Sequence, residues 1–166
     1  MSGTEEKVIL FYRERDAYGY YSNFSKYEIT VDGFKFRHNE QYIMYSKAML
    51  FGDLETAKKI MESKTPTEIK RLGRTVKGFV QQTWNENVNK IADTCNYAKF
   101  TQHLNLKKLL LETDSAILAE ASPSDRIWGI GVDSITGKDR KTWNGMNILG
   151  NSLMRVREFI KKNPQS

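Results

Sequence analysis

The strongest constraint on the fold is a long amphipathic segment in the middle of the chain, from about residue 80 to residue 103. Trp84, Val88, Ile91 and Cys95 follow one another at steps of three and four residues, and Gln102 falls near the same stripe. This spacing is typical of an α-helix with one apolar face. The segment therefore predicts a long helix, in which Trp84 and Cys95 belong to the packed face.

Cap and breaker signals predict five further helices. These are a helix that Asn39 caps and Gly52 ends, the stretch 54–61 capped by Asp53, a short helix from the capping box Thr65-Pro66-Thr67-Glu68 to Gly73, a leucine-rich helix capped by Asn105, and a last helix over residues 147–161 with Leu149, Leu153, Val156 and Ile160 on its core side.

Strand signals concentrate near the start of the chain. Residues 7–12 form an apolar run, and residues 26–31 alternate before Asp32-Gly33, a favoured pair for a tight hairpin turn. Residues 34–37 then return along the hairpin. A small sheet is therefore predicted in this region.

The length of 166 residues, without repeats, predicts a single domain over residues 1–166 with its core at about 7–162. The chain lacks a run of about 18 apolar residues and a signal-peptide pattern, so we expect an intracellular protein, cytoplasmic or nuclear, without a membrane partner. Cys95 cannot form an internal disulfide, and with His38 and His103 it makes a poor metal-ligand set. We expect no metal, no cofactor and a monomer.

The chain is basic, with 26 lysines and arginines against 20 acidic residues and a formal net charge of +6. Such a balance favours an anionic partner such as phosphate or nucleic acid. The basic residues are spread along the sequence and form no single block, so the charge alone does not identify the partner.

Glu40 and Lys47 are the first candidates for catalysis, because seven residues are about two helical turns and both side chains then face one way. Ile43 and Met44 share that face. Ionisable groups are costly to bury unless they are paired or used, so this mixture indicates the wall of a pocket. The alternative is a solvated helix edge, which is where charged side chains usually lie.

Three segments combine aromatic, polar and small residues, and we expect them to form one site. Aromatic rings can sandwich a flat heterocycle, an asparagine can hydrogen-bond its edge, and glycines let backbone amides approach a phosphate. The alternative is that Phe24 and Trp128 belong to the core, although a tryptophan beside glycines in a polar loop favours the site. The segments are Tyr20-Tyr21-Ser22-Asn23-Phe24, the helix 40–47, and Asp125-Arg126-Ile127-Trp128-Gly129-Ile130-Gly131.

Motifs of other reaction classes are missing. Gly129-Ile130-Gly131 lacks the strand-to-helix setting of a dinucleotide fingerprint, so no Rossmann domain is expected. The chain has no Gly-x-Ser-x-Gly elbow, no phosphate-loop lysine motif and no His-Glu-x-x-His. A carboxylate and an amine remain for acid–base or nucleophilic work. Residues 122–145, rich in glycine and polar residues, predict a functional loop.

Ordered motifs along most of the chain resemble the NADAR family. The resemblance runs from Phe11 to nearly the C-terminus. Its anchors are Phe11-Tyr12, Ser22-Asn23-Phe24, Glu40-Gln41-Tyr42 with Lys47, Gly73-Arg74, Trp84, Lys99-Phe100, Asp125 with Trp128-Gly129-Ile130-Gly131, and Asn147-Ile148-Leu149-Gly150 with Leu153-Met154 and Arg157.

The resemblance implies a compact α+β fold, mostly helical around a small antiparallel-containing sheet. It also implies N-glycosidase activity: some family members hydrolyse the ribosylamino bond of phosphorylated riboflavin-pathway pyrimidines, and others remove ADP-ribose from the guanine amino group in nucleic acid. Glu40 would then stabilise oxocarbenium-like charge or activate water. Lys47 would pair with phosphate or carboxylate, or attack a ring-opened sugar as a Schiff-base nucleophile. Asp125 matches a family acid that could bind ribose hydroxyls or transfer a proton.

The remaining site predictions concern substrate binding. Arg74 is a natural phosphate partner because its fork binds such oxygens bidentately, and a surface arginine after a helix is the alternative. The expected substrate-binding residues are Tyr21, Ser22, Asn23, Phe24, Tyr42, Arg74, Trp128, Gly129, Gly131 and Asn147.

Net positive charge favours nucleic acid carrying ADP-ribosylated guanine over a small metabolite as the substrate. The expected partner is therefore such a nucleic acid, or an ADP-ribose-like small molecule. One alternative is activity on the riboflavin-pathway ribosylaminopyrimidine phosphates. Another is a non-catalytic reader of ADP-ribose or modified nucleic acid, against which the presence of Glu40, Lys47 and Asp125 argues.

Overall fold

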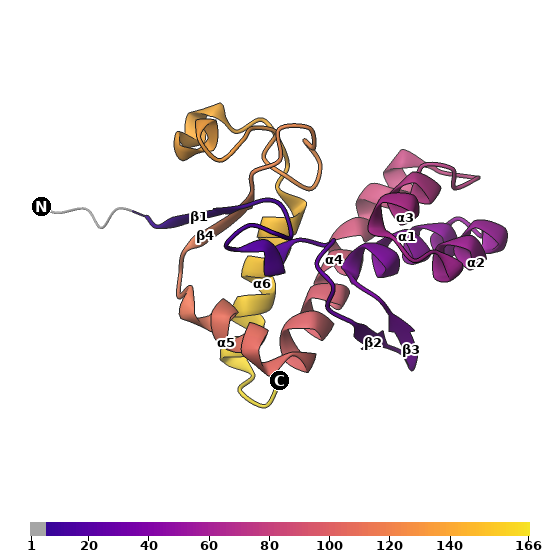
Figure 1. The fold of residues 1–166 in the computed structure, drawn as a ribbon, viewed down its shortest axis with the longest axis horizontal. Helices are drawn as coiled ribbons and strands as arrows, with labels where there is room; N and C mark the ends of the chain where they lie inside the picture. Colours follow the sequence, from indigo (N-terminus) through magenta and orange to yellow (C-terminus); the bar gives the residue numbers. More distant parts are fainter. Residues whose placement is uncertain (1–5) are drawn as a thin grey trace, which may run out of the picture. The chain divides into compact units, whose positions relative to one another are not determined.

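The computed structural model describes residues 6–166, which divide into two units. The central unit is Asn23–His103, and the terminal unit joins the chain up to Ser22 with Leu104–Ser166. Each unit combines helices with one two-stranded sheet (Figure 1). The predicted α+β class, mostly helical, is confirmed.

The central unit is organised around α1, which contacts α2, α3, α4 and β3. Ile43 and Ala48 of α1 are buried together with Ile60, Ile69 and Val88 from the surrounding helices. The elements of this unit are β2 (Ile29–Val31), β3 (Phe34–Phe36), α1 (Asn39–Leu50), α2 (Leu54–Glu62), α3 (Pro66–Gly73) and α4 (Gln81–Gln102).

Side-chain caps start the three short helices of the central unit. Asp53 accepts from the Thr56 backbone N–H, and Thr65 accepts from that of Glu68, as predicted. The predicted cap of α1 is wrong by one residue. His38 caps this helix through Nδ1, which accepts from the Gln41 N–H at 3.2 Å.

The predicted hairpin is confirmed as β2 and β3, in which Ile29 lies opposite Phe36. Asp32 and Gly33 both have positive φ values, 51° and 82°, as a tight turn that follows the twist of the strands requires. Gln102, at the end of α4, binds the N–H and the C=O of Thr30 with its side-chain amide, at 2.9 and 2.7 Å. The predicted long helix therefore ends by capping the edge of this sheet.

The terminal unit has a parallel sheet, in which Val8 of β1 lies opposite Ile117 of β4 (Figure 1). The prediction of one small sheet near the start of the chain is wrong, because β1 and the hairpin belong to separate sheets. Parallel strands need a long crossover, which local patterns do not reveal. The elements are β1 (Val8–Phe11), η1 (Gly19–Tyr21), α5 (Leu104–Glu112), β4 (Ile117–Glu120), η2 (Thr136–Lys138), η3 (Arg140–Thr142) and α6 (Ile148–Lys162).

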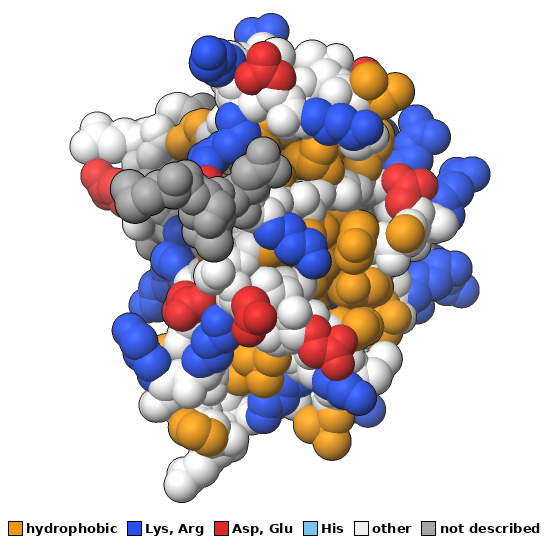
Figure 2. Space-filling view, turned by 90° about the vertical axis from the view of Figure 1, so that its left-hand side faces the viewer, with side chains coloured by type: hydrophobic (Ala, Val, Ile, Leu, Met, Phe, Trp, Pro, Cys, Tyr) orange, Lys and Arg blue, Asp and Glu red, His pale blue; other side chains and the backbone are white. Residues whose placement is uncertain are grey.

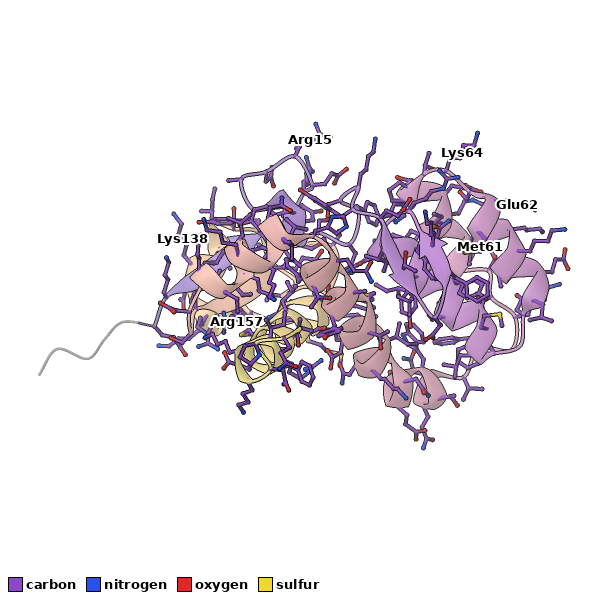
Figure 3. All side chains as sticks on the ribbon, turned by 90° about the horizontal axis from the view of Figure 1, so that it is seen from below. Arg15, Met61, Glu62, Lys64, Lys138 and Arg157 are labelled. Carbon is purple, nitrogen blue, oxygen red and sulfur yellow. The ribbon has the colours of Figure 1, made fainter. Side chains whose placement is uncertain are left out.

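Helix α6 packs against β4 and buries the four residues predicted for its core side. Arg157, labelled on this helix in Figure 3, is also buried. Its Nη1 donates to Thr113 Oγ1 at 3.0 Å and to the Ala116 carbonyl at 2.7 Å. These bonds satisfy the buried guanidinium and tie α6 to the turn before β4. The predicted Asn105 cap of α5 is wrong, because that helix begins at Leu104.

Charged side chains are widely distributed on the surface. On the face shown in Figure 2, lysines and arginines are interspersed with acidic side chains and do not gather into one basic block. Within residues 6–166, no helix combines the length and apolar character that crossing a bilayer requires.

Candidate active site

Helix α1 carries both candidate catalytic side chains. Glu40 lies in its first turn and Lys47 in its last. Glu40 is only 8% exposed, Met44 beside it is buried, and Lys47 is half-buried. The Glu40 N–H donates to the Asn23 carbonyl at 3.0 Å, which holds this end of α1 against the segment before the hairpin. The alternative of a solvated helix edge does not describe this face.

The Lys47 amine lies in a partly apolar setting. Its Nζ donates to the Gly73 carbonyl at 2.8 Å and lies 4.8 Å from the centre of the Phe79 ring and 5.7 Å from that of Trp84. Burial lowers the pKa of Lys47, the negative charge of Glu40 opposes this shift, and the positive charge of Arg74 adds to it. The lowered pKa increases the fraction of neutral, nucleophilic amine.

Gly73 makes this arrangement possible at the end of α3. A Cβ at this position would lie 2.0 Å from the sulfur of Met44, the residue that separates Glu40 from Lys47 on α1. The missing side chain therefore lets α3 approach α1 closely, with the Gly73 carbonyl within reach of Lys47.

Arg74 follows at the C-terminal end of α3, and its side chain is exposed. No carboxylate within residues 6–166 forms an ion pair with its guanidinium. Its effect on the Lys47 pKa shows that the two charges act on each other. The charges of Glu40 and Arg74 therefore both act on Lys47 within the central unit.

The other predicted residues of the central unit differ in their surroundings. Asn23 is buried, and its carbonyl accepts the hydrogen bond from the Glu40 N–H. Phe24 is half-buried, and its ring centre lies 5.8 Å from Lys70 Nζ. Tyr42 is about 200° around the helix from Glu40 and so faces away from the Glu40–Lys47 side. Its ring packs 5.1 Å from that of Phe36, and burial raises its pKa. The structure favours a packing role for Tyr42, and its binding role stays a prediction.

Tyr21 and Ser22 belong to the terminal unit, and both are buried. The Tyr21 ring packs 5.2 Å from Phe11 and 4.6 Å from Tyr20, measured between ring centres. Burial raises the pKa of the Tyr21 hydroxyl. Because the side chain has no exposed surface, the structure favours packing over stacking on a heterocycle, and the binding roles of both residues stay predictions.

The predicted loop places Asp125, Trp128, Gly129 and Gly131 in one turn. Asp125 Oδ1 accepts from the backbone N–H groups of Ile127 and Trp128, at 2.9 and 2.8 Å. A Cβ at Gly129 would lie 2.8 Å from the Glu120 carbonyl oxygen. Gly131 has a φ of 79°. The aspartate and the glycines therefore shape the loop, and Trp128 is half-buried within it.

Asn147 joins this loop to β4. Its Oδ1 accepts from the Glu120 N–H at 3.1 Å, and its Nδ2 donates to the Leu118 carbonyl at 3.0 Å. Its φ of 50° is in the left-handed region that asparagine tolerates. Both polar atoms of the side chain thus bind the backbone, and the predicted role in substrate binding is not needed to explain this residue.

Sequence patterns did not reveal three parts of the site. Phe79 belongs to no helical or strand pattern, so the sequence did not indicate that its ring lies beside Lys47. The Gly73 carbonyl is a backbone group, and only the Gly73-Arg74 motif of the resemblance pointed to this position. Trp84 is buried, as predicted for the packed face of α4, and in addition its ring lies close to Lys47.

The described residues offer little for other chemistry. Within residues 6–166, no group of three or more His, Cys, Asp or Glu side chains is placed to hold a metal ion. Cys95 is buried, and burial raises its pKa, which keeps the thiol protonated and unreactive.

Comparison with known proteins identifies the family of this chain. The NADAR domain family model matches residues 10–161. The chain belongs to the NADAR family. This NADAR domain is 41% identical over 138 residues to an N-glycosidase of Acanthamoeba polyphaga mimivirus, covering 82% of this chain and 81% of the viral protein. It is 33% identical over 156 residues to N-glycosidase YbiA of Escherichia coli, covering 94% of this chain and 90% of YbiA.

The NMR structure of Escherichia coli YbiA has a similar fold. The TM-score is 0.81 at 30% sequence identity, and the match covers 99% of this NADAR domain and 90% of the YbiA chain. The α+β fold that the motifs implied is therefore found in a solved relative.

Proposed function

We propose that this NADAR domain hydrolyses N-glycosidic bonds and removes ADP-ribose from the guanine amino group in nucleic acid. The observation that carries the proposal is the buried Glu40 on the same helical face as Lys47, whose pKa burial lowers. Relatives that carry the name N-glycosidase support the reaction class. The net charge of +6 supports a nucleic-acid substrate over a small metabolite.

Lys47 acts as the nucleophile on a ring-opened sugar. When the ribose ring opens, its ring oxygen takes a proton and the anomeric carbon becomes an imine to the guanine nitrogen. Neutral Lys47 adds to this carbon, and the guanine amine leaves with a proton, so a lysine imine replaces the guanine imine. Water then adds to the lysine imine and releases the sugar aldehyde, which closes to free ADP-ribose and restores the amine.

Glu40 serves the proton transfers of this sequence. Its carboxylate can take a proton from the attacking amine and return it to the leaving guanine nitrogen. In a direct hydrolysis without the imine, the same carboxylate would stabilise oxocarbenium-like charge or activate water. The roles in substrate binding that the family motif implies for Asp125 and Trp128 stay predictions.

A second substrate class has one observation in its favour. Arg74 is exposed and has no ion-pair partner within residues 6–166. Its positive charge lowers the pKa of Lys47. An arginine and a lysine beside one another suit the terminal phosphate of a ribosylaminopyrimidine phosphate as well as a diphosphate. Such riboflavin-pathway compounds are therefore the alternative substrates.

A substrate panel separates the two classes. The purified protein is incubated with an oligonucleotide carrying ADP-ribosylated guanine, with a ribosylaminopyrimidine phosphate, and with unmodified oligonucleotide as the control. We expect release of ADP-ribose from the first substrate at the highest kcat/KM. Rapid cleavage of the pyrimidine phosphate with the modified oligonucleotide left intact would reverse the order. Tight ADP-ribose binding without any product would instead favour a non-catalytic reader.

Borohydride trapping tests the role of Lys47. Reduction during turnover should fix the lysine imine as a stable adduct, located at Lys47 by mass spectrometry. Lys47→Arg keeps the positive charge and should give no adduct, because a guanidinium does not form this imine. If wild type turns over and no adduct is trapped, Lys47 forms no imine. Its role would then be charge pairing, and the reaction would be direct hydrolysis assisted by Glu40.

A further inference from the structure

The exposed side of α3 carries two basic residues that the assigned roles do not fully use. Lys70 and Arg74 are four residues apart, so they are neighbours on one side of the helix. Neither forms an ion pair with a carboxylate within residues 6–166. Like charges at this spacing repel each other, so the pair has an electrostatic cost in the free protein.

Arg71 on the same helix shows the contrasting case. Its guanidinium binds both oxygens of Glu68, with Nε to Oε2 at 2.8 Å and Nη2 to Oε1 at 2.5 Å. Favourable interaction of cations with a helix C-terminus would apply to all three residues alike. It therefore does not explain why one cation is paired and two are left without a carboxylate.

Lys70 is restrained in spite of having no acidic partner. It is half-buried, and its Nζ lies 5.8 Å from the centre of the half-buried Phe24 ring. A cation above an aromatic face is attracted by the ring and loses part of its freedom. A long side chain held in this way is more nearly ready to bind an anion than one that moves freely in water.

The positive charge extends from Lys70 and Arg74 to Lys47. The Lys47 amine binds the Gly73 carbonyl, the residue directly before Arg74. Arg74 lowers the pKa of Lys47, so the two cations repel each other. An anion bound at Arg74 would relieve this repulsion and would lie next to the amine that attacks the sugar.

We propose that Lys70 and Arg74, with Lys70 held by the ring of Phe24, form the binding site for the 5′-phosphoryl group of the ribose whose anomeric carbon meets Lys47. The identity of the bound group rests on the proposed function, because both candidate substrates carry a phosphoryl group on that ribose. The guanidinium of Arg74 binds two phosphoryl oxygens, and Lys70 supplies a point charge. Lys70 is thereby assigned to substrate binding together with Arg74.

The test is a binding titration that needs no turnover. Ribose 5-phosphate and ribose are titrated into isotope-labelled protein, and binding is followed by NMR chemical shifts. Wild type should prefer ribose 5-phosphate, and Lys70→Ala and Arg74→Ala should each weaken its binding by about tenfold, the effect of one charge-assisted hydrogen bond. Phe24→Leu should weaken it less, because only the restraint on Lys70 is lost.

Arg71→Ala and Lys59→Ala are the matched controls. Each removes one positive charge from α3 or α2, but from a side chain that pairs with a carboxylate on its own helix. Both should leave the affinity for ribose 5-phosphate within about twofold of wild type, as expected for exposed ion pairs. Equal weakening by Arg71→Ala and Lys70→Ala would show a diffuse charge effect and overturn the proposal, as would equal binding of ribose and ribose 5-phosphate to wild type.

This experiment separates the proposal from the proposed reaction. A protein that hydrolyses no N-riboside but binds ribose 5-phosphate through Lys70 and Arg74 would refute the reaction and keep the phosphoryl site. A protein that hydrolyses N-ribosides, with unchanged preference for phosphorylated substrates in Lys70→Ala, would keep the reaction and refute the site at Lys70.

Discussion

The loop between β4 and α6 in the terminal unit and the α1–α3 face in the central unit are both polar, but they use their polar groups differently. In the loop, Asp125 and Asn147 bind backbone groups of the same unit. On the α1–α3 face, Lys70 and Arg74 have no carboxylate partner within residues 6–166. Lys47 donates to a carbonyl and lies near two rings, and the charges of Glu40 and Arg74 act on its pKa.

This difference separates polar residues that build the fold from polar residues available to a ligand. An aspartate or asparagine that binds neighbouring N–H groups shapes its own turn, so its presence in a glycine-rich loop is explained without a substrate. A cation placed beside another cation has no such explanation. We therefore expect substitutions in the loop to lower stability first, and substitutions on the α1–α3 face to lower activity first.

The largest expected effect is loss of activity in Glu40→Gln and Lys47→Ala. Each should lower kcat/KM by about 1,000-fold or more, because the proposed mechanism uses Lys47 as the nucleophile and Glu40 for the proton transfers. The free energy of unfolding of Lys47→Ala should stay within about 1 kcal/mol of wild type, since a half-buried cation adds little to stability. Kinetics on the preferred substrate and urea unfolding measure the two quantities.

Lys59→Ala is the control, because Lys59 is exposed and pairs with Glu55 on α2. It should retain full activity. If Lys47→Ala lowered stability as strongly as activity, the contrast between the two regions would fail at its main point.

The second effect is a loss of stability in Asn147→Ala, by about 2–4 kcal/mol. Two backbone groups of β4 would lose their partners, and alanine would also occupy a left-handed backbone position. Asn147→Gly relieves the backbone strain but not the lost hydrogen bonds, so comparing both variants by urea unfolding separates the two causes. An Asn147→Ala protein with normal stability and lost activity would place Asn147 among the substrate ligands.

Local signals predicted the elements whose boundaries are set by local physics. The Thr65 and Asp53 caps, the Asp32-Gly33 turn and the apolar stripe of α6 each depend on residues a few positions apart. The pairing of β1 with β4 depends on strands more than 100 residues apart, and no local pattern reports it. The cap of α1 was missed because Asn39 is a strong cap residue, yet its side chain donates to Asn96 Oδ1 at 2.8 Å instead.

The site follows the same rule. Glu40 and Lys47 could be predicted because one helix fixes both side chains on one face. The partners of Lys47 could not, since Gly73 and Phe79 reach it from other parts of the central unit. Tyr42 shows the converse case. It is two residues from Glu40 in sequence, but positions two apart lie about 200° apart around a helix, so its ring packs against Phe36, and its binding role stays a prediction.

The third effect concerns pH and a lysine that the fold itself uses. Lys99 is 1% exposed, its Nζ donates to Ser25 Oγ at 2.8 Å, and burial lowers its pKa to about 7. An unfolded lysine, with a pKa near 10.5, binds more protons between about pH 7 and 10, so stability should rise with pH in this range. Between pH 7 and pH 9 the unfolding free energy of wild type should rise by about 2 kcal/mol more than that of Lys99→Met.

Lys99→Met retains the length and apolar stem of the side chain without the titrating group, so the comparison isolates the charge. A gain of the same size in Lys99→Met would assign the pH dependence to other groups. Full activity of the variant would confirm that burial alone does not mark a lysine as catalytic in this unit.

The smallest effect is expected from Gly73→Ala, which should lower stability by about 1 kcal/mol because the new methyl group forces the Met44 side chain to move. Met44 lies between Glu40 and Lys47 on α1, and Lys47 binds the Gly73 carbonyl, so the methyl group should also displace these two side chains. We therefore expect activity to fall even though nearly all of the protein stays folded. The double variant Gly73→Ala/Met44→Ala removes the clash, so a double-mutant cycle should show a favourable coupling of about 0.5 kcal/mol or more in unfolding free energy. Additive effects would mean that the two helices already have room for the methyl group, and the close approach of α3 to α1 would then not be what fixes the position of Lys47.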